Sequence, residues 1–187
     1  SFADSRLPLR VEAGPHQVRV LAHCRYSRTG EGLHRFVDPA DSCTYLYTQF
    51  EPVNARRMFA CFAQPDLKAE FAITAIAPED WTMVSNGALL GTESLGDGFA
   101  RITFAETKPI STYLTALIAG AYHGVERTLH APSGDIPAAV FCRRSLAEHL
   151  DADRIWDVTE KGFAVFERAF AQPYPFGKYD QVFVPEY

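Results

Sequence analysis

Short runs of strand-forming residues, separated by turn signals, occupy the first three quarters of this 187-residue chain. The runs are rich in β-branched and aromatic residues, which favour strands. Turn-forming pairs and triplets such as Asn86-Gly87 and Gly96-Asp97-Gly98 stand between them. We expect strands at 18–25, 44–50, 70–77, 81–86, 99–104 and 113–119. Short strands at this spacing favour an antiparallel β-sandwich or a similar saddle-like, mainly β domain.

A different pattern follows Gly120. The spacing predicts a hairpin of 125–129 with 138–142, then a helix over 151–171 and a last strand at 181–184. Ser145 and Glu148 have the capping-box spacing that precedes a helix. A strand so near a C-terminus has few partners for its backbone. We therefore expect 1–122 to belong to the β domain and 123–187 to open a second, α/β domain whose remainder is missing.

Composition limits the function classes. Hydrophobic residues make up 47% of the chain and aromatic residues 13%, which is ample material for a packed core. The net charge of -5 argues against a nucleic-acid partner, since such proteins carry basic patches. No apolar stretch approaches the roughly 20 residues needed to cross a bilayer, so no membrane partner is expected.

The sequence contains no complete catalytic set. None of the six histidines is followed by Glu, so the H-E-x-x-H zinc helix is absent, and there is no Gly-x-Ser-x-Gly motif. His34 is interpreted as a structural loop histidine rather than a ligand. Widely spaced cysteines favour buried core residues over a zinc site, and their pairing stays open; they are Cys24, Cys43, Cys61 and Cys142.

Four blocks of residues form a recognisable series along the chain. They are 47–52 with 55–57 and 61–69, then 81–87, then 104–114 with Gly120, and finally 173–187. Within them stand Tyr47-Thr48-Gln49-Phe50-Glu51-Pro52 and the closing Val182-Phe183-Val184-Pro185-Glu186-Tyr187. In this order the blocks resemble the aminopeptidase N family of zinc exopeptidases (gluzincins), in particular its bacterial, actinobacterial members.

The resemblance implies that the chain is an N-terminal fragment. It would begin inside the family's β domain and end just before the Gly-Ala-Met-Glu-Asn motif, with 123–187 opening a thermolysin-like catalytic domain. The parent would be a zinc metalloaminopeptidase that removes N-terminal residues from peptides, located in the cytoplasm like its bacterial relatives. Its partners would be a peptide with a free N-terminus and the remainder of the catalytic domain. Zinc is expected in the parent, and the fragment is expected to bind none and to be inactive.

The resemblance also assigns substrate contacts to Gln49 and Glu51. A strand places residues i and i+2 on one face, so both side chains can point into one site. Glu51 would bind the α-ammonium group of the substrate, and Gln49 would line the first side-chain pocket. No catalytic residue and no metal ligand is expected in the chain.

Two alternatives remain open. The chain departs from the family at Ala63-Gln64, where relatives often have Asp-Glu, and this puts a salt bridge to Arg56 or Arg57 in doubt. The departure permits a degenerate, inactive family member. The other alternative is a stand-alone β-sandwich binding module with no enzymatic parent.

Overall fold

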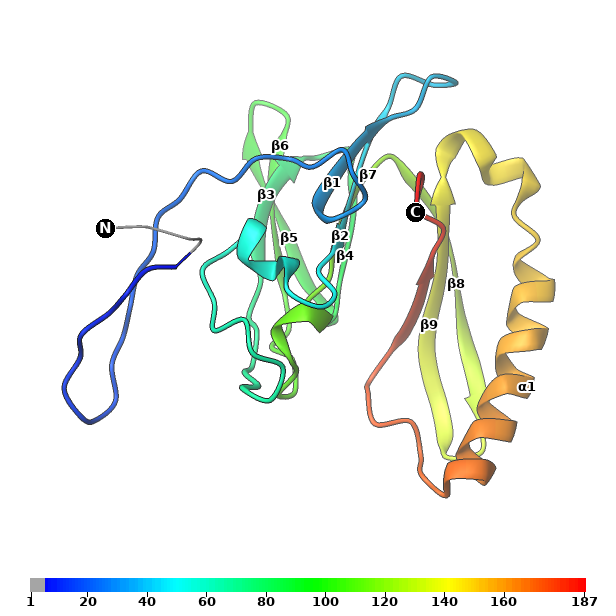
Figure 1. Cartoon of the computed structure of the whole chain (residues 1–187). Coiled ribbons are helices and arrows are strands. Elements are labelled where there is room, and N and C mark those ends of the chain that lie inside the picture. The colour runs from blue at the N-terminus through cyan, green and yellow to red at the C-terminus, as the bar shows by residue number, and fades with distance from the viewer. Residues whose placement is uncertain (1–5) are drawn as a thin grey trace.

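The computed structural model describes residues 6–187 and is mainly β (Figure 1). A four-stranded antiparallel sheet has the order β1-β2-β7-β4, and a three-stranded antiparallel sheet has the order β3-β6-β5. A third sheet has the order β10-β9-β8, in which β10 is parallel to β9. The strands are β1 (Gly32–Val37), β2 (Thr44–Gln49), β3 (Thr74–Pro78), β4 (Thr82–Ser85), β5 (Leu89–Gly96), β6 (Phe99–Phe104), β7 (Leu117–Gly120), β8 (Tyr122–Ala131), β9 (Gly134–Arg143) and β10 (Tyr179–Val182). The helices are the α-helix α1 (Ala152–Phe170) and the 3-10 helices η1 (Asn54–Arg57), η2 (Thr112–Leu114) and η3 (Arg144–His149).

The first two sheets pack against each other through an apolar layer. Ala100, Ile102 and Phe104 of β6 are buried, and Met83 of β4 and Trp81, just before β4, pack against them. Alternate residues of β6 supply this layer, as the two-residue period of a strand requires. This packing agrees with the expected mainly β, sandwich-like domain.

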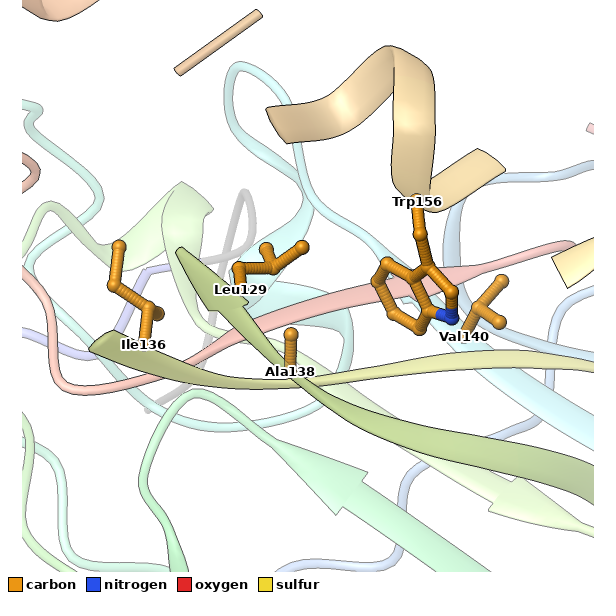
Figure 2. Packing of buried hydrophobic residues seen from close by; sticks show 5 residues of the cluster. All are labelled: Leu129, Ile136, Ala138, Val140 and Trp156. Atoms are coloured by element: carbon orange, nitrogen blue, oxygen red, sulfur yellow. The ribbon is translucent and has the colours of Figure 1, made fainter. Parts of the chain in front are cut away.

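The third sheet and α1 form a second core. Trp156 of α1 is 1% exposed and packs with Leu129 of β8 and Val140 of β9. Figure 2 shows its indole ring reaching from the helix towards the hairpin, beside Val140. The helix begins after Asp151, whose side chain accepts a hydrogen bond from Arg154 N at 3.2 Å. The capping box predicted at Ser145 does not start this helix, because Ser145 lies in η3.

The strand predicted at 18–25 is wrong. Residues 18–25 have no regular structure, and Figure 1 shows the blue N-terminal part of the chain extending to one side of the sheets before it returns to β1. Val18, Val20 and Leu21 are all exposed, Leu21 at 91%. Alternating residues predict which face of a strand would be buried, but a strand also needs a neighbour for its backbone groups, and none lies beside this segment within residues 6–187.

The remaining predictions differ from the structure mainly at their ends. The strand over 99–104 and the helix over 151–171 are confirmed, as β6 and α1 (152–170). The strand predicted over 113–119 begins only at Leu117, because 112–114 form η2. Two strands were missed: β1, taken as a loop, and β5, whose residues are all exposed and give no burial pattern.

Gly120 marks the place where the chain leaves the four-stranded sheet for the third sheet. Its φ is 146°, and a Cβ there would lie 2.5 Å from Thr44 O. Only glycine fits this close approach of two strands. The chain changes sheet at Ala121, and the division into 1–122 and 123–187 stays a prediction.

Candidate functional site at the end of strand β2

Gln49 and Glu51 lie together at the end of β2. Gln49 is the last residue of the strand and pairs with Gly32 of β1. Glu51 follows in a turn, and its backbone N donates to Gln49 Oε1 at 2.9 Å. The Glu51 side chain is exposed and has no ion-pair partner within residues 6–187. The structure therefore brings the two residues together and leaves the Glu51 carboxylate accessible.

Gln49 shares a strand face with Tyr45 and Tyr47, because alternate residues of a strand point the same way. That face meets the third sheet. Tyr45 packs with Tyr122 of β8, their ring centroids 5.0 Å apart. The Tyr47 hydroxyl donates to Glu186 O at 3.3 Å. The face of β2 that carries Gln49 is thus the one that contacts the segment after β10.

His34 fixes the same segment from β1. It is 1% exposed, and its Nδ1 accepts a hydrogen bond from Gly30 N at 3.0 Å. Since a backbone N–H can only donate, the ring hydrogen is on Nε2, which donates to Glu186 Oε2 at 3.2 Å. His34 is structural, as predicted, but it lies in a strand and not in a loop. Sequence reasoning missed the contacts of Glu186 with His34 and Tyr47, because the partners are 152 and 139 residues apart in the chain.

A second contact between the four-stranded sheet and the third sheet is a buried ionic network around Asp38. Asp38, which follows β1, is 2% exposed. Its Oδ2 accepts hydrogen bonds from Arg143 Nη1 at 2.8 Å and Ser145 Oγ at 2.6 Å, and its Oδ1 accepts one from Ala40 N. The hydrogen bond from Ser145, opposed by burial and helped by Arg143, lowers the pKa of Asp38 below its ordinary value. The Arg143 guanidinium also lies 5.4 Å from the ring centroid of Phe36.

Arg57, one of the two arginines that an acid at position 63 or 64 could have paired with, pairs with Glu31 in this chain. Arg57 Nη2 lies 3.1 Å from Glu31 Oε2, so an acid on the turn before β1 pairs with this arginine. Both side chains are half exposed, and such pairs contribute at most about 1 kcal/mol.

Metal-ligating side chains do not gather in the described part of the chain. No three His, Cys, Asp or Glu residues among 6–187 are placed to hold a metal ion, so these residues do not fit a zinc centre. The four cysteines are free, and only Cys142 is buried. The expectation that they occupy core positions is therefore wrong for Cys24, which is exposed. No helix within residues 6–187 is long and apolar enough to cross a membrane.

Comparison with known sequences identifies the class of protein. Residues 15–114 match the family model of the Peptidase M1 N-terminal domain. The chain therefore belongs to the peptidase M1 family, and the resemblance to aminopeptidase N noted in the sequence is confirmed.

The relatives are named as aminopeptidases. The chain is 51% identical over its whole length to Aminopeptidase N of Streptomyces lividans, an actinobacterium, and spans 21% of that protein. It is 37% identical over 140 residues to the mitochondrial Aminopeptidase 2 of Saccharomyces cerevisiae, covering 75% of this chain and 14% of the relative. Aminopeptidase N of Acetobacter pasteurianus is 28% identical over 186 residues, 98% of this chain and 51% of that protein.

Proposed function

We propose that this chain supplies part of the substrate-binding wall of a zinc-dependent aminopeptidase that removes N-terminal residues from peptides. The relatives' names support an aminopeptidase parent. The observation that carries the assignment to the end of β2 is the hydrogen bond from Glu51 N to Gln49 Oε1, which holds the two residues side by side.

The chemistry of the pair suits a free N-terminus. Glu51 offers an unpaired carboxylate, and a carboxylate facing an ammonium group makes a charge-assisted hydrogen bond of about 1.5–3 kcal/mol. The Gln49 amide oxygen is already used by Glu51 N, so its NH2 group remains to contact the substrate. Recognition of the ammonium group would select exopeptidase action, because an internal peptide bond offers none.

The catalytic chemistry falls to residues outside this chain. A zinc ion in the parent would polarise the scissile carbonyl and activate a water molecule. Residues 6–187 offer it no ligand set. We therefore expect the 187-residue chain alone to be inactive and to bind no stoichiometric zinc. The remainder of the catalytic domain would be its partner, and a cytoplasmic location stays a prediction.

The test is the kinetics of the full-length parent with Glu51→Gln, a change that removes the charge and keeps the shape. Loss of about 1.5–3 kcal/mol corresponds to a fall of roughly 10- to 150-fold in kcat/KM for aminoacyl substrates, with KM rising. The control is Glu93→Gln, which alters an exposed acid on β5 that, unlike Glu51, pairs with Arg101. If both variants keep wild-type kinetics, Glu51 does not contact substrate.

Turnover by the wild-type parent decides between the alternatives. A parent without aminopeptidase activity would instead be a degenerate family member or a binding module. Chelator-sensitive turnover by the 187-residue chain alone would contradict the proposed division of roles.

A further inference from the structure

The segment after β10 runs along the face of β2 that carries the candidate site. Val182 packs against the apolar cluster around Tyr45, and Glu186 contacts Tyr47. From 182 to 186 the chain therefore advances in the same direction as β2, and Gln49 is the next residue on that face, about 7 Å beyond Tyr47. Figure 1 shows this red end of the chain on the side of the third sheet that faces β1 and β2. The chain at Glu186 is thus directed toward the candidate site.

Glu186 has a backbone conformation that a glutamate rarely adopts. Its φ is 54°, in the left-handed region, and it follows Pro185 in a turn. A proline followed by a residue of positive φ is the arrangement of a type II turn, which usually places glycine or asparagine after the proline. A strained residue of this kind persists only where its surroundings hold it, and such residues gather at functional sites.

Two buried side chains hold Glu186 in this turn. Tyr47 is 2% exposed and His34 is 1% exposed, and their ring centroids are 4.9 Å apart. The Tyr47 hydroxyl donates to the Glu186 carbonyl oxygen, and His34 Nε2 donates to the Glu186 carboxylate. Burial, and then the neighbouring charge of Glu186, raises the pKa of Tyr47, so its hydroxyl stays protonated and can donate. The backbone and the side chain of Glu186 are therefore both bound by the β1-β2 pair.

The hold on Glu186 also determines where Tyr187 lies. The ring centroid of Tyr187 is 6.3 Å from that of Tyr47, and Tyr187 is 85% exposed. The aromatic ring is therefore attached to the same strand face as Gln49 and remains accessible to a ligand.

We infer that Tyr47 and His34 are positioning residues for the proposed aminopeptidase reaction. They hold Glu186 in its turn and so place Tyr187 as a second side of the substrate-binding wall. The inference rests on the proposed function and adds a substrate class to it: the Tyr187 ring contacts apolar side chains at the N-terminus of the peptide. A contact that binds substrate and transition state equally changes KM and leaves kcat unchanged.

The test is the kinetics of the full-length parent with Tyr47→Phe, which removes only the hydroxyl. The loss of one hydrogen bond predicts a rise of about 2- to 12-fold in KM for substrates with an apolar N-terminal residue, at unchanged kcat. The matched control is Tyr45→Phe, at a buried tyrosine on the same strand face whose hydroxyl donates to Asp41 Oδ2 at 2.8 Å. The control should leave KM unchanged, because Tyr45 does not hold the turn.

The split between KM and kcat separates positioning from stability. A variant that only lowers the folded fraction loses apparent kcat at constant KM, since the remaining folded molecules bind substrate normally. An unchanged KM in Tyr47→Phe, or an equal rise in Tyr45→Phe, overturns the inference.

A pair of substitutions at Glu186 tests the strained turn itself. Glu186→Ala and Glu186→Gly both remove the carboxylate, but only glycine adopts a φ of 54° without strain. The glycine variant should therefore keep a KM closer to that of the wild type than the alanine variant does. Equal KM values, or a higher KM for the glycine variant, overturn the inference.

Glu51→Gln distinguishes this inference from the proposed function. If Glu51→Gln raises KM and Tyr47→Phe does not, the substrate contact stands and the positioning role fails. If only Tyr47→Phe raises KM, the positioning role stands and the contact assigned to Glu51 fails. If neither variant changes the kinetics, or the parent has no turnover, both proposals fail.

Discussion

Arg143 Nη1 lies 2.8 Å from Asp38 Oδ2, and this pair joins the turn after β1 to the end of β9, 105 residues further along the chain. The two partners are buried unequally, since the Arg143 side chain is 23% exposed and that of Asp38 only 2%. The contact lies where the four-stranded sheet meets the third sheet, so it links the two cores of the molecule.

Removing Arg143 and removing Asp38 should lower the free energy of unfolding by different amounts. Arg143→Leu leaves a buried, uncompensated carboxylate and is expected to cost about 3–5 kcal/mol. Asp38→Asn leaves an arginine that reaches water and keeps an acceptor for Ser145, so it should cost about 1.5–3 kcal/mol. Urea unfolding of both variants measures the difference. Equal losses would show that the two charges are equally desolvated, contrary to their exposures.

The pH dependence of stability tests the same network. The folded pKa of Asp38 lies below its ordinary value of 3.8, so the folded state favours the ionised form. The stabilisation is therefore present above about pH 4 and is lost as the pH falls through the lowered folded pKa. Wild type and Asp38→Asn should differ in unfolding free energy at pH 7 and converge in acid. A constant gap down to pH 2 would mean that Asp38 does not titrate with folding.

Gly120 should not tolerate a side chain, because a Cβ there would clash with backbone. Comparison with a second glycine, Gly134, separates this clash from the cost of a positive φ. Gly120 and Gly134 have φ values of 146° and 130°, but only at Gly120 does a Cβ meet backbone, at 2.5 Å from Thr44 O. Gly134→Ala should cost about 1–3 kcal/mol for backbone strain alone. Gly120→Ala should cost about 1–3 kcal/mol more, because two strands must separate. Thermal unfolding of the two variants gives the difference, and similar losses would contradict the steric argument.

Local residue patterns were sufficient for elements whose partners are close in sequence. The helix over 152–170 was predicted because its apolar spacing and the prolines after it are local signals. β6 was predicted within its observed bounds, since it alternates and follows the Gly96-Asp97-Gly98 turn. β5 was missed because its residues, LLGTESLG, do not alternate between apolar and polar, and the structure leaves all of them exposed.

Long-range contacts were beyond local patterns. Residues 18–25 have strand composition but no neighbouring strand, whereas β1 gains its place from pairing with β2. At the candidate site, Gln49 and Glu51 came from the family resemblance. The strand periodicity that was expected to place them on one face does not apply, because Glu51 lies in the turn after β2, and the hydrogen bond from Glu51 N to Gln49 Oε1 holds them together. The contacts of Glu186 with His34 and Tyr47 span 152 and 139 residues, and no local signal reports such separations.

His34 supports the last prediction, because its two ring nitrogens have different partners. His34→Phe keeps a ring beside Tyr47 but leaves Gly30 N without its acceptor and Glu186 without its donor. We expect a loss of about 1–3 kcal/mol, the cost of an unsatisfied buried group. Glu186→Gln keeps a neutral acceptor for Nε2–H at a side chain that is 57% exposed, so its effect should stay below about 1 kcal/mol. Urea unfolding of both single variants and the double variant measures the coupling. If Glu186→Gln costs as much as His34→Phe, the hydrogen bond to Glu186, and not the one from Gly30, dominates the role of this histidine.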